Sequence, residues 1–163
     1  MVRRPSAEEL IERFGLRPHI EGGHYRRIFR SERTVLRAGE SRAALTCIHF
    51  LLRQGEHSSW HEVASDEAWH FLAGDPLELL VFDPNGSGQV ESILLGSVEL
   101  SGTVPSHVVP ARTWQAARPT GEFSFAGCTV GPGFEFSDFR FVREIPGHEG
   151  RFPDLPPSYR NLL

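Results

Sequence analysis

The stretch that most constrains this chain is residues 55–74, GEHSSWHEVASDEAWHFLAG, where two short strand-like runs lie between two glycines. Successive side chains of a β-strand point to opposite faces of the sheet. If His61 faces inward, Val63 does too, and if Glu67 faces inward, so do Trp69 and Phe71. One imidazole and one carboxylate would then lie among apolar and aromatic groups, which is the usual composition of a small-molecule site.

The remainder of the chain also divides into short runs typical of strands. The candidate strands are residues 25–30, 44–52, 68–72, 77–82, 92–95, 107–109, 113–117, 123–130 and 139–143. They are separated by turn residues such as Gly74-Asp75-Pro76 and Gly131-Pro132-Gly133. About nine strands within 163 residues predict one all-β domain, a sandwich or barrel of the jelly-roll type.

A short helix is expected before the barrel, at about residues 6–14. Ser6 and Glu9 form a capping-box pattern, and Gly15 stands where the helix should end. The barrel is expected at about residues 25–143. The Pro-rich tail, residues 144–163, is expected to pack over the surface or across a subunit contact.

Composition excludes several classes of function. The net charge of −4 favours neither nucleic acid nor a membrane surface as a partner. No apolar run approaches the ~20 residues of a spanning helix, and the N-terminus lacks the apolar region of a signal peptide. Cys47 and Cys128 are expected to be reduced core thiols. These features predict a cytoplasmic protein.

The spacing of residues 55–74 resembles the first cupin motif, G-x5-H-x-H-x3-E-x6-G, with Val63 at the second His position. Residues 109–115 resemble the end of the second motif, P-x-G-x2-H. There Pro110 is kept, Arg112 takes the Gly position and Gln115 takes the final His position. In cupins the His and Glu positions of these motifs hold a metal ion, so the resemblance implies a barrel whose ligand set is altered at two of four positions.

A metal site built from what remains would be weak. His61 and Glu67 are sound ligands, whereas Gln115 offers only a neutral amide oxygen. We therefore expect no cofactor, or at most a weakly bound divalent ion held by these three residues.

Longer segments resemble one small cupin family in particular, catalogued as a domain of unknown function. The matching segments are residues 18–26, 60–71, 74–79, 109–119 and 127–134. The resemblance implies a double-stranded β-helix, the cupin form of the jelly-roll barrel, and usually a homodimer. It implies no agreed activity. The nearest functional analogy is to the dTDP-sugar epimerases, which share the barrel and work without a metal ion.

The leading hypothesis is a metal-independent isomerase or epimerase acting on a sugar-like or carbonyl compound. His61 would be the base, Glu67 would orient it, and Gln115 would hydrogen-bond a substrate oxygen. Two alternatives stay open: a non-catalytic binding or sensing module, and a metal-dependent cupin enzyme whose site is completed by ligand oxygens.

Further ligand contacts are expected around this pair. Trp69 and Phe71 would supply apolar surface, and Arg112 could grip an anionic group at the barrel mouth. An epimerase also needs an acid on the opposite face of its substrate. Tyr25 could serve if residues 21–26 fold over the mouth, although Gly22-Gly23 also fits a tight turn into the first strand.

Overall fold

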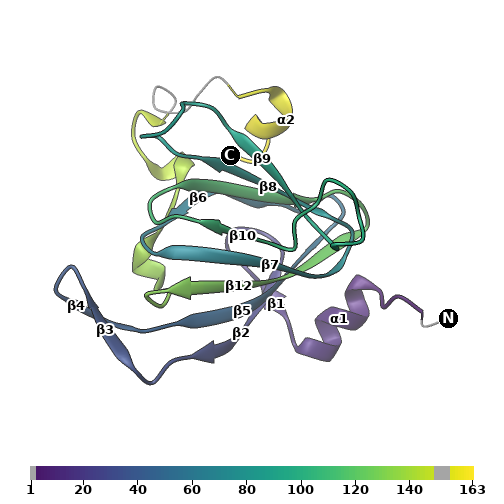
Figure 1. Ribbon diagram of the computed structural model, residues 1–163, viewed down its shortest axis with the longest axis horizontal. Helices are drawn as coiled ribbons and strands as arrows, with labels where there is room; N and C mark the ends of the chain where they lie inside the picture. The colour runs from purple at the N-terminus through teal and green to yellow at the C-terminus, as the bar shows by residue number, and fades with distance from the viewer. Residues whose placement is uncertain (1–2, 149–154) are drawn as a thin grey trace.

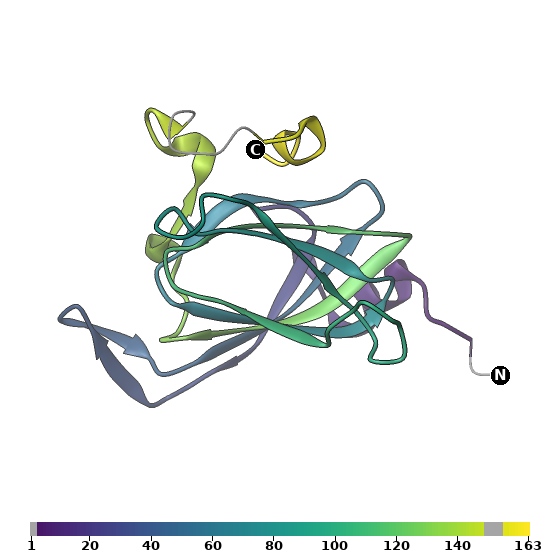
Figure 2. The same cartoon turned by 45° about the horizontal axis from the view of Figure 1, so that its top comes forward.

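The computed structural model describes residues 3–148 and 155–163, and two antiparallel sheets dominate it (Figure 1). The first sheet has the order β1 (Arg17–Pro18), β2 (His24–Arg30), β5 (Thr46–Arg53), β12 (Phe123–Gly131), β7 (Asp66–Gly74) and β10 (Ser106–Val109). The second has the order β13 (Phe139–Phe141), β6 (Ser58–Val63), β11 (Trp114–Pro119), β8 (Leu77–Phe82) and β9 (Glu91–Leu95). Turned by 45°, the two sheets enclose a barrel (Figure 2).

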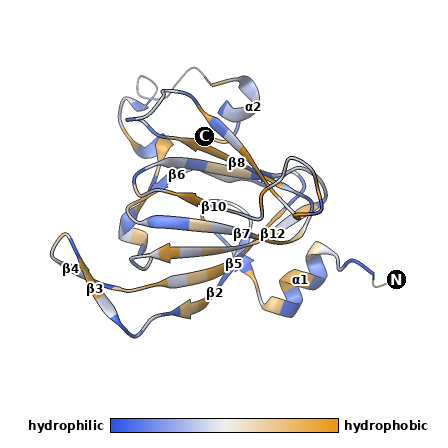
Figure 3. Ribbon diagram, in the orientation of Figure 1, coloured by the Kyte–Doolittle hydropathy of each residue, from blue (hydrophilic) through white to orange (hydrophobic). Residues whose placement is uncertain are grey.

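The predicted all-β barrel with a short N-terminal helix is confirmed. Each of the nine predicted strands is present, with ends that differ by at most two residues from those expected. Along several strands hydrophobic and hydrophilic residues alternate, as expected where one face of each sheet is turned inward (Figure 3). The sequence did not indicate the hairpin of β3 (Thr34–Arg37) and β4 (Glu40–Ala43), which extends away from the barrel (Figure 1).

The N-terminal helix α1 (Ala7–Phe14) has the predicted boundaries. The hydroxyl of Ser6 accepts from the backbone N–H of Glu9, whose carboxylate accepts from the N–H of Ser6. Gly15 ends the helix with φ 60°, a left-handed conformation that suits glycine. Leu10 is buried with Leu51, Phe123 and Phe125, so the helix covers the outer face of the first sheet.

The described end of the tail, residues 155–163, packs on the second sheet. Leu155 and Leu162 are buried against Trp60 and Leu80, and the helix α2 (Pro157–Arg160) lies between them in sequence. The indole N–H of Trp60 donates to the carbonyl of Tyr159 at 3.0 Å. Two 3₁₀ turns, Phe136–Asp138 and Val142–Glu144, lead from the barrel toward the tail.

One part of the barrel interior is a closely packed core. Its members include Phe50, Trp69, Leu79, Leu95 and Val109, each at most 2% exposed. Both cysteines are free thiols, with Cys128 buried. Among the described residues, no helix has the length and apolar character needed to span a bilayer.

Candidate functional site

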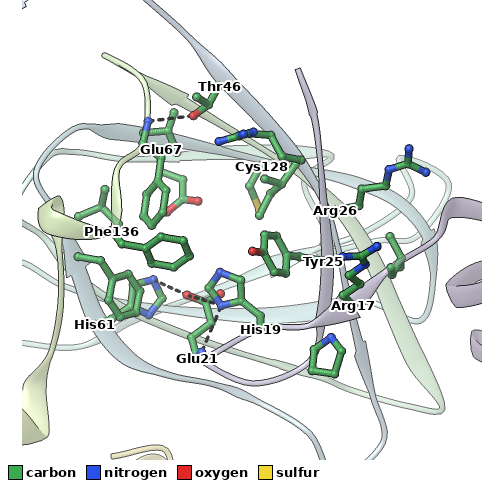
Figure 4. Close-up of a pocket in the computed structure, with 18 of the residues that line it drawn as sticks. Arg17, His19, Glu21, Tyr25, Arg26, Thr46, His61, Glu67, Cys128 and Phe136 are labelled. Carbon is green, nitrogen blue, oxygen red and sulfur yellow. Dashed lines mark hydrogen bonds and ion pairs between the residues drawn. The ribbon is translucent and has the colours of Figure 1, made fainter. Parts of the chain in front are cut away.

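The rest of the barrel interior is a cavity of about 980 Å³. Its wall includes side chains from β2, β5, β6, β7 and β12, the segment between α1 and β2, and three phenylalanines that follow β12: Phe134, Phe136 and Phe139. A volume of this order accommodates a small organic molecule. About half of the lining residues are polar or charged, and they come from distant parts of the chain (Figure 4).

His61 on β6 is the imidazole of this cavity and is 2% exposed. Its Nδ1 lies 2.7 Å from the carbonyl oxygen of Ser59. Because a carbonyl oxygen only accepts, Nδ1 carries a proton and donates it to this bond. The other nitrogen, Nε2, lies 3.3 Å from Oε2 of Glu21, and the ring of Phe139 stacks on the imidazole at 4.8 Å. Both the tautomer and the ring orientation of His61 are therefore held in place.

Glu21 reaches His61 because its backbone runs very close to neighbouring chain segments. A Cβ on Gly22, whose φ is +113°, would lie 1.9 Å from the carbonyl oxygen of His57. A Cβ on Gly23 would lie 2.6 Å from the carbonyl oxygen of Leu51. Only glycine permits this approach. It lets the carbonyl of Glu21 accept from the N–H of Ser59 at 2.8 Å, which fixes Glu21 beside β6.

Burial acts in opposite directions on the two members of this pair. It raises the pKa of Glu21, although His19 and a hydrogen bond from Ser58 oppose the rise. It lowers the pKa of His61, although Glu67 and the Ser59 carbonyl oppose the fall. Burial thus favours the neutral form of both groups, in which the carboxylic acid of Glu21 donates a hydrogen bond to Nε2 of His61, so one proton lies between the two groups.

Glu67 on β7 is the second buried carboxylate of the cavity. Its Oε2 accepts from Nε2 of Gln115 at 2.5 Å, and Oε1 of Gln115 accepts from the indole N–H of Trp69 at 2.8 Å. Burial raises the pKa of Glu67 to about 7, and Glu21 adds to the rise while His61 and Gln115 oppose it. Glu67 therefore changes its charge near neutral pH.

Three of the predicted site residues line the cavity, Tyr25, His61 and Glu67, and so does Val63. The hydroxyl of Tyr25 and the carboxylate of Glu67 point into it from different sides (Figure 4). Within the described part of the chain, the Tyr25 hydroxyl makes no protein hydrogen bond. Gly22 and Gly23 form a turn that leads directly into β2, which was one of the two interpretations of that segment, and Tyr25 reaches the cavity wall as the second residue of β2.

The other four residues expected to touch a ligand lie outside the cavity wall. Trp69 is 1% exposed in the packed core, and Phe71 packs against that core. Gln115 donates to Glu67 and accepts from Trp69, and it does not line the cavity. The Arg112 side chain is 63% exposed and lies 3.7 Å from Glu62. Strand parity gave the facing direction of Trp69 but could not show how far along the strand the cavity extends.

The expected roles of Glu67 and Gln115 also need correction. The sequence suggests that Glu67 orients His61, whereas the carboxylate within 3.3 Å of the imidazole is Glu21. The amide oxygen of Gln115 faces the Trp69 indole, which can only donate, so this oxygen is not presented to a metal ion. In the described ranges, no three His, Cys, Asp or Glu side chains are grouped to hold a metal ion. The residues present do not fit a cupin metal centre.

His19 and Glu21 were not among the predicted site residues, yet both line the cavity. The backbone N–H of Glu21 donates to Nδ1 of His19 at 3.2 Å, and the His19 ring meets that of Tyr25 edge-on at 4.4 Å. The available signal was the pattern His19-x-Glu21-Gly22-Gly23, in which two ionisable residues precede a glycine pair.

Comparison with known proteins gives a consistent picture. A family model described as Cupin superfamily (DUF985) matches residues 8–142. A search of curated proteins finds no significant match. A crystal structure of a protein from Shewanella oneidensis has 31% sequence identity and a TM-score of 0.79, with 97% of each chain covered.

Two further solved structures are informative. A hypothetical protein from Leishmania major has 29% identity and a TM-score of 0.80, with 91% of this chain and 97% of that chain covered. Oxalate decarboxylase from Lactobacillus farciminis, solved as a formate complex, has 14% identity and a TM-score of 0.56, with 81% and 35% covered. At that identity the likeness shows the barrel fold alone.

Proposed function

The chain belongs to the DUF985 family of the cupin superfamily, and from that premise we propose that its barrel cavity binds a small carbonyl compound and moves a proton on it. The reaction class is that of a metal-independent isomerase or epimerase. The observation that carries the proposal is the cluster of Glu21, His61 and Glu67, hereafter the acid–base cluster, which is buried in the wall of the barrel cavity.

Glu67 is the base in this proposal. A base works best when its pKa lies near the working pH, and the pKa of Glu67 is raised to about 7. Its carboxylate takes the proton from the carbon next to the carbonyl group, and the electron pair of that C–H bond moves toward the carbonyl oxygen. Apolar side chains such as Phe139 and Val63 exclude water, which strengthens the electrostatic interactions inside the cavity.

Tyr25 is the acid. Its hydroxyl points into the cavity from a different side than Glu67 (Figure 4). A proton from this phenol to the opposite face of the carbon restores the carbonyl group and gives the epimer. In an α-hydroxy carbonyl compound, a proton to the former carbonyl carbon gives the isomer, while the hydroxyl proton moves to the former carbonyl oxygen. The phenolate then regains its proton from solvent, and Glu67 releases the one it took.

The Glu21–His61 pair sets the charge beside the base. An imidazolium near Glu67 lowers the pKa of that carboxyl, and an ionised Glu21 raises it. Because the pair shares one proton, its net charge stays at zero as the proton moves between Nε2 and Oε2. His61 therefore contributes to catalysis by setting the pKa of Glu67.

Solvent deuterium incorporation tests this function. A panel of α-hydroxy aldehydes, α-hydroxy ketones and ketose sugars is incubated with the protein in D₂O and analysed by mass spectrometry. We expect exchange at the carbon next to the carbonyl in the wild type, loss of exchange in Glu67→Gln, and wild-type exchange in Arg112→Ala, which lies outside the cavity. Exchange that persists in Glu67→Gln would remove Glu67 as the base.

The second candidate function is a binding or sensing module. The specific observation in its favour is that both nitrogens of His61 already have partners, so the ring is held in one orientation without a substrate. Compounds that raise the melting temperature without undergoing exchange would support this module and contradict the isomerase.

The homodimer expected from the family resemblance belongs to the same proposal. Large apolar side chains are exposed on β2 and on the β3–β4 hairpin: Ile28, Phe29 and Leu36 are 52%, 51% and 78% exposed. Burial of such residues in a subunit interface would stabilise the dimer. Sedimentation should give a dimer for the wild type and a smaller species for Leu36→Glu; a monomeric wild type would contradict the dimer.

A further inference from the structure

We propose that the cavity includes an oxyanion subsite formed by Arg17 and Arg27, so that the ligand carries a phosphate or carboxylate group at one end. The inference rests on the proposed function for its substrate class: an anionic carbonyl compound whose charged group binds the arginines while its carbonyl carbon reaches the acid–base cluster. The two arginines are distinct from Arg112, which lies outside the cavity wall.

Strand register places both arginines on the inner face of the first sheet. Arg17 on β1 is the cross-strand partner of Tyr25 on β2, and residues directly opposite each other share a face. Arg27 follows Tyr25 by two positions on the same strand, so it shares that face as well. Its own cross-strand partner on β5 is Ile48, and all four residues line the cavity.

The two arginines are diagonal neighbours in this register, a spacing of roughly 7–8 Å that long side chains can bridge. Both arginines are exposed, so solvent screens part of their repulsion, and an anion between them would offset the rest. Arg17 lies next to Tyr25, on the side away from His19 (Figure 4). In the same view the Tyr25 hydroxyl points away from Arg17, toward the middle of the cavity (Figure 4).

Neither arginine has a carboxylate partner among the described residues. Most other arginines of the described chain do, as Arg118 does with Glu78 at 2.6 Å and Arg30 with Glu135 at 2.6 Å. The adjacent Arg26 also lines the cavity, but its guanidinium donates to the carbonyl of Phe14 at the end of α1. In the part of the wall that the structure describes, Glu12 is the one carboxylate near this end of α1, and it forms no ion pair with Arg17 or Arg27.

The charge distribution along the cavity orients such a ligand. The acid–base cluster contains two carboxyl groups, which disfavour an anion beside them, whereas the guanidinium groups offer paired N–H donors that match phosphate and carboxylate oxygens. An elongated anionic ligand therefore binds with its charged end at Arg17 and Arg27 and its neutral end at Glu67.

Isothermal titration calorimetry at low salt tests the subsite, with inorganic phosphate in one arm and acetate in the other. We expect wild-type binding of at least one anion and about tenfold weaker binding in Arg17→Gln and in Arg27→Gln, the loss typical of a charge-assisted hydrogen bond. The control is Arg33→Gln: Arg33 is exposed, has no ion-pair partner in the described chain and lies off the cavity, so the variant should bind as the wild type does.

Tighter binding of phosphate would identify a phosphorylated ligand, and tighter binding of acetate a carboxylate. Binding of neither anion by the wild type, or equal binding by the wild type and both variants, would overturn the subsite.

The same variants separate this inference from the proposed function. Arginine-dependent anion binding without deuterium exchange on any compound would leave the subsite standing and remove the isomerase. If deuterium exchange requires Glu67 but anion affinity is unchanged in Arg17→Gln and Arg27→Gln, the isomerase is supported and the subsite is contradicted.

Discussion

The barrel interior has a packed half and a cavity half, and they meet on β7, where residues only two positions apart lie in different halves. Trp69 lies in a packed core with Phe50, whose ring meets the indole edge-on at 5.7 Å. Glu67 lies in the cavity, where burial raises its pKa to about 7. The packed half supplies apolar burial that stabilises the fold, and the cavity half bears the cost of keeping ionisable groups out of water.

The two halves are connected by one amide. Gln115 accepts from Trp69 and donates to Glu67, so the packed half fixes the position of a carboxylate in the cavity. The comparison teaches that the open half depends on the packed half for its geometry, and variants of each half test this dependence.

The largest effect is expected for Trp69→Ala, which removes a side chain that is 1% exposed. A cavity of that size in a core lowers the free energy of unfolding by about 3–5 kcal/mol. Trp69→Phe is the matched variant, because it keeps an aromatic ring and loses only the N–H donor to Gln115. Urea unfolding should give it a smaller loss, of about 1–3 kcal/mol. Equal losses in the two variants would mean that packing contributes nothing separate from the hydrogen bond.

Glu67→Gln is expected to change the pH dependence of stability. In the wild type the pKa of Glu67 is about 7 in the folded state and near 4.5 in the unfolded state. Between these values the folded state binds more protons, so stability falls as pH rises, by about 3 kcal/mol in total. Glu67→Gln should lack this fall and exceed the wild type in stability above pH 7.

Unfolding by urea at a series of pH values from 4 to 8 measures the effect. Glu99→Gln serves as control, since Glu99 is exposed and outside the cavity, and it should follow the wild-type profile. A Glu67→Gln profile parallel to that of the wild type would show that Glu67 ionises as freely in the fold as in water.

Gly22→Ala should lower the free energy of unfolding by about 2–3 kcal/mol, because the new methyl group must displace the His57 carbonyl or the Glu21 segment. Gly55→Ala is its control: Gly55 has φ +82°, but its added methyl group would meet no atom within 4 Å, so only the conformational cost of about 1 kcal/mol applies. Thermal denaturation measures both. Gly22→Ala should also weaken ligand binding, whereas Gly55→Ala should not.

The smallest effect is expected for Arg112→Ala. The side chain is mostly exposed and its ion pair with Glu62 is long, at 3.7 Å. Such pairs contribute little, so the free energy of unfolding should change by less than about 0.5 kcal/mol and anion affinity should be unchanged. A marked loss of anion affinity in Arg112→Ala would show that Arg112 contributes to anion binding.

The sequence predicts the barrel well because alternation along a strand is a local property. It placed His61 and Glu67 on inward faces through the spacing of residues 55–74, and both line the cavity. Gly15 and the Ser6–Glu9 pair likewise marked the ends of α1 through local backbone chemistry.

What the sequence could not predict depends on contacts between distant segments. Glu21 becomes part of the site because Gly22 lets the backbone pass beside His57, some 35 positions later in the chain. Gln115 turns its nitrogen toward Glu67 because an indole from the other sheet occupies its oxygen. Neither contact produces a repeating pattern in the sequence from which it could be predicted.

The chain of hydrogen bonds from Trp69 through Gln115 to Glu67 also couples the ionisation of Glu67 to the fluorescence of Trp69. Indole emission responds to the polarity and hydrogen bonding of its surroundings, and the N–H of Trp69 is tied through one amide to a carboxyl group that ionises near neutral pH. Gain or loss of a proton at Glu67, or arrival of a ligand beside it, therefore reaches a chromophore buried in the core, with no label attached.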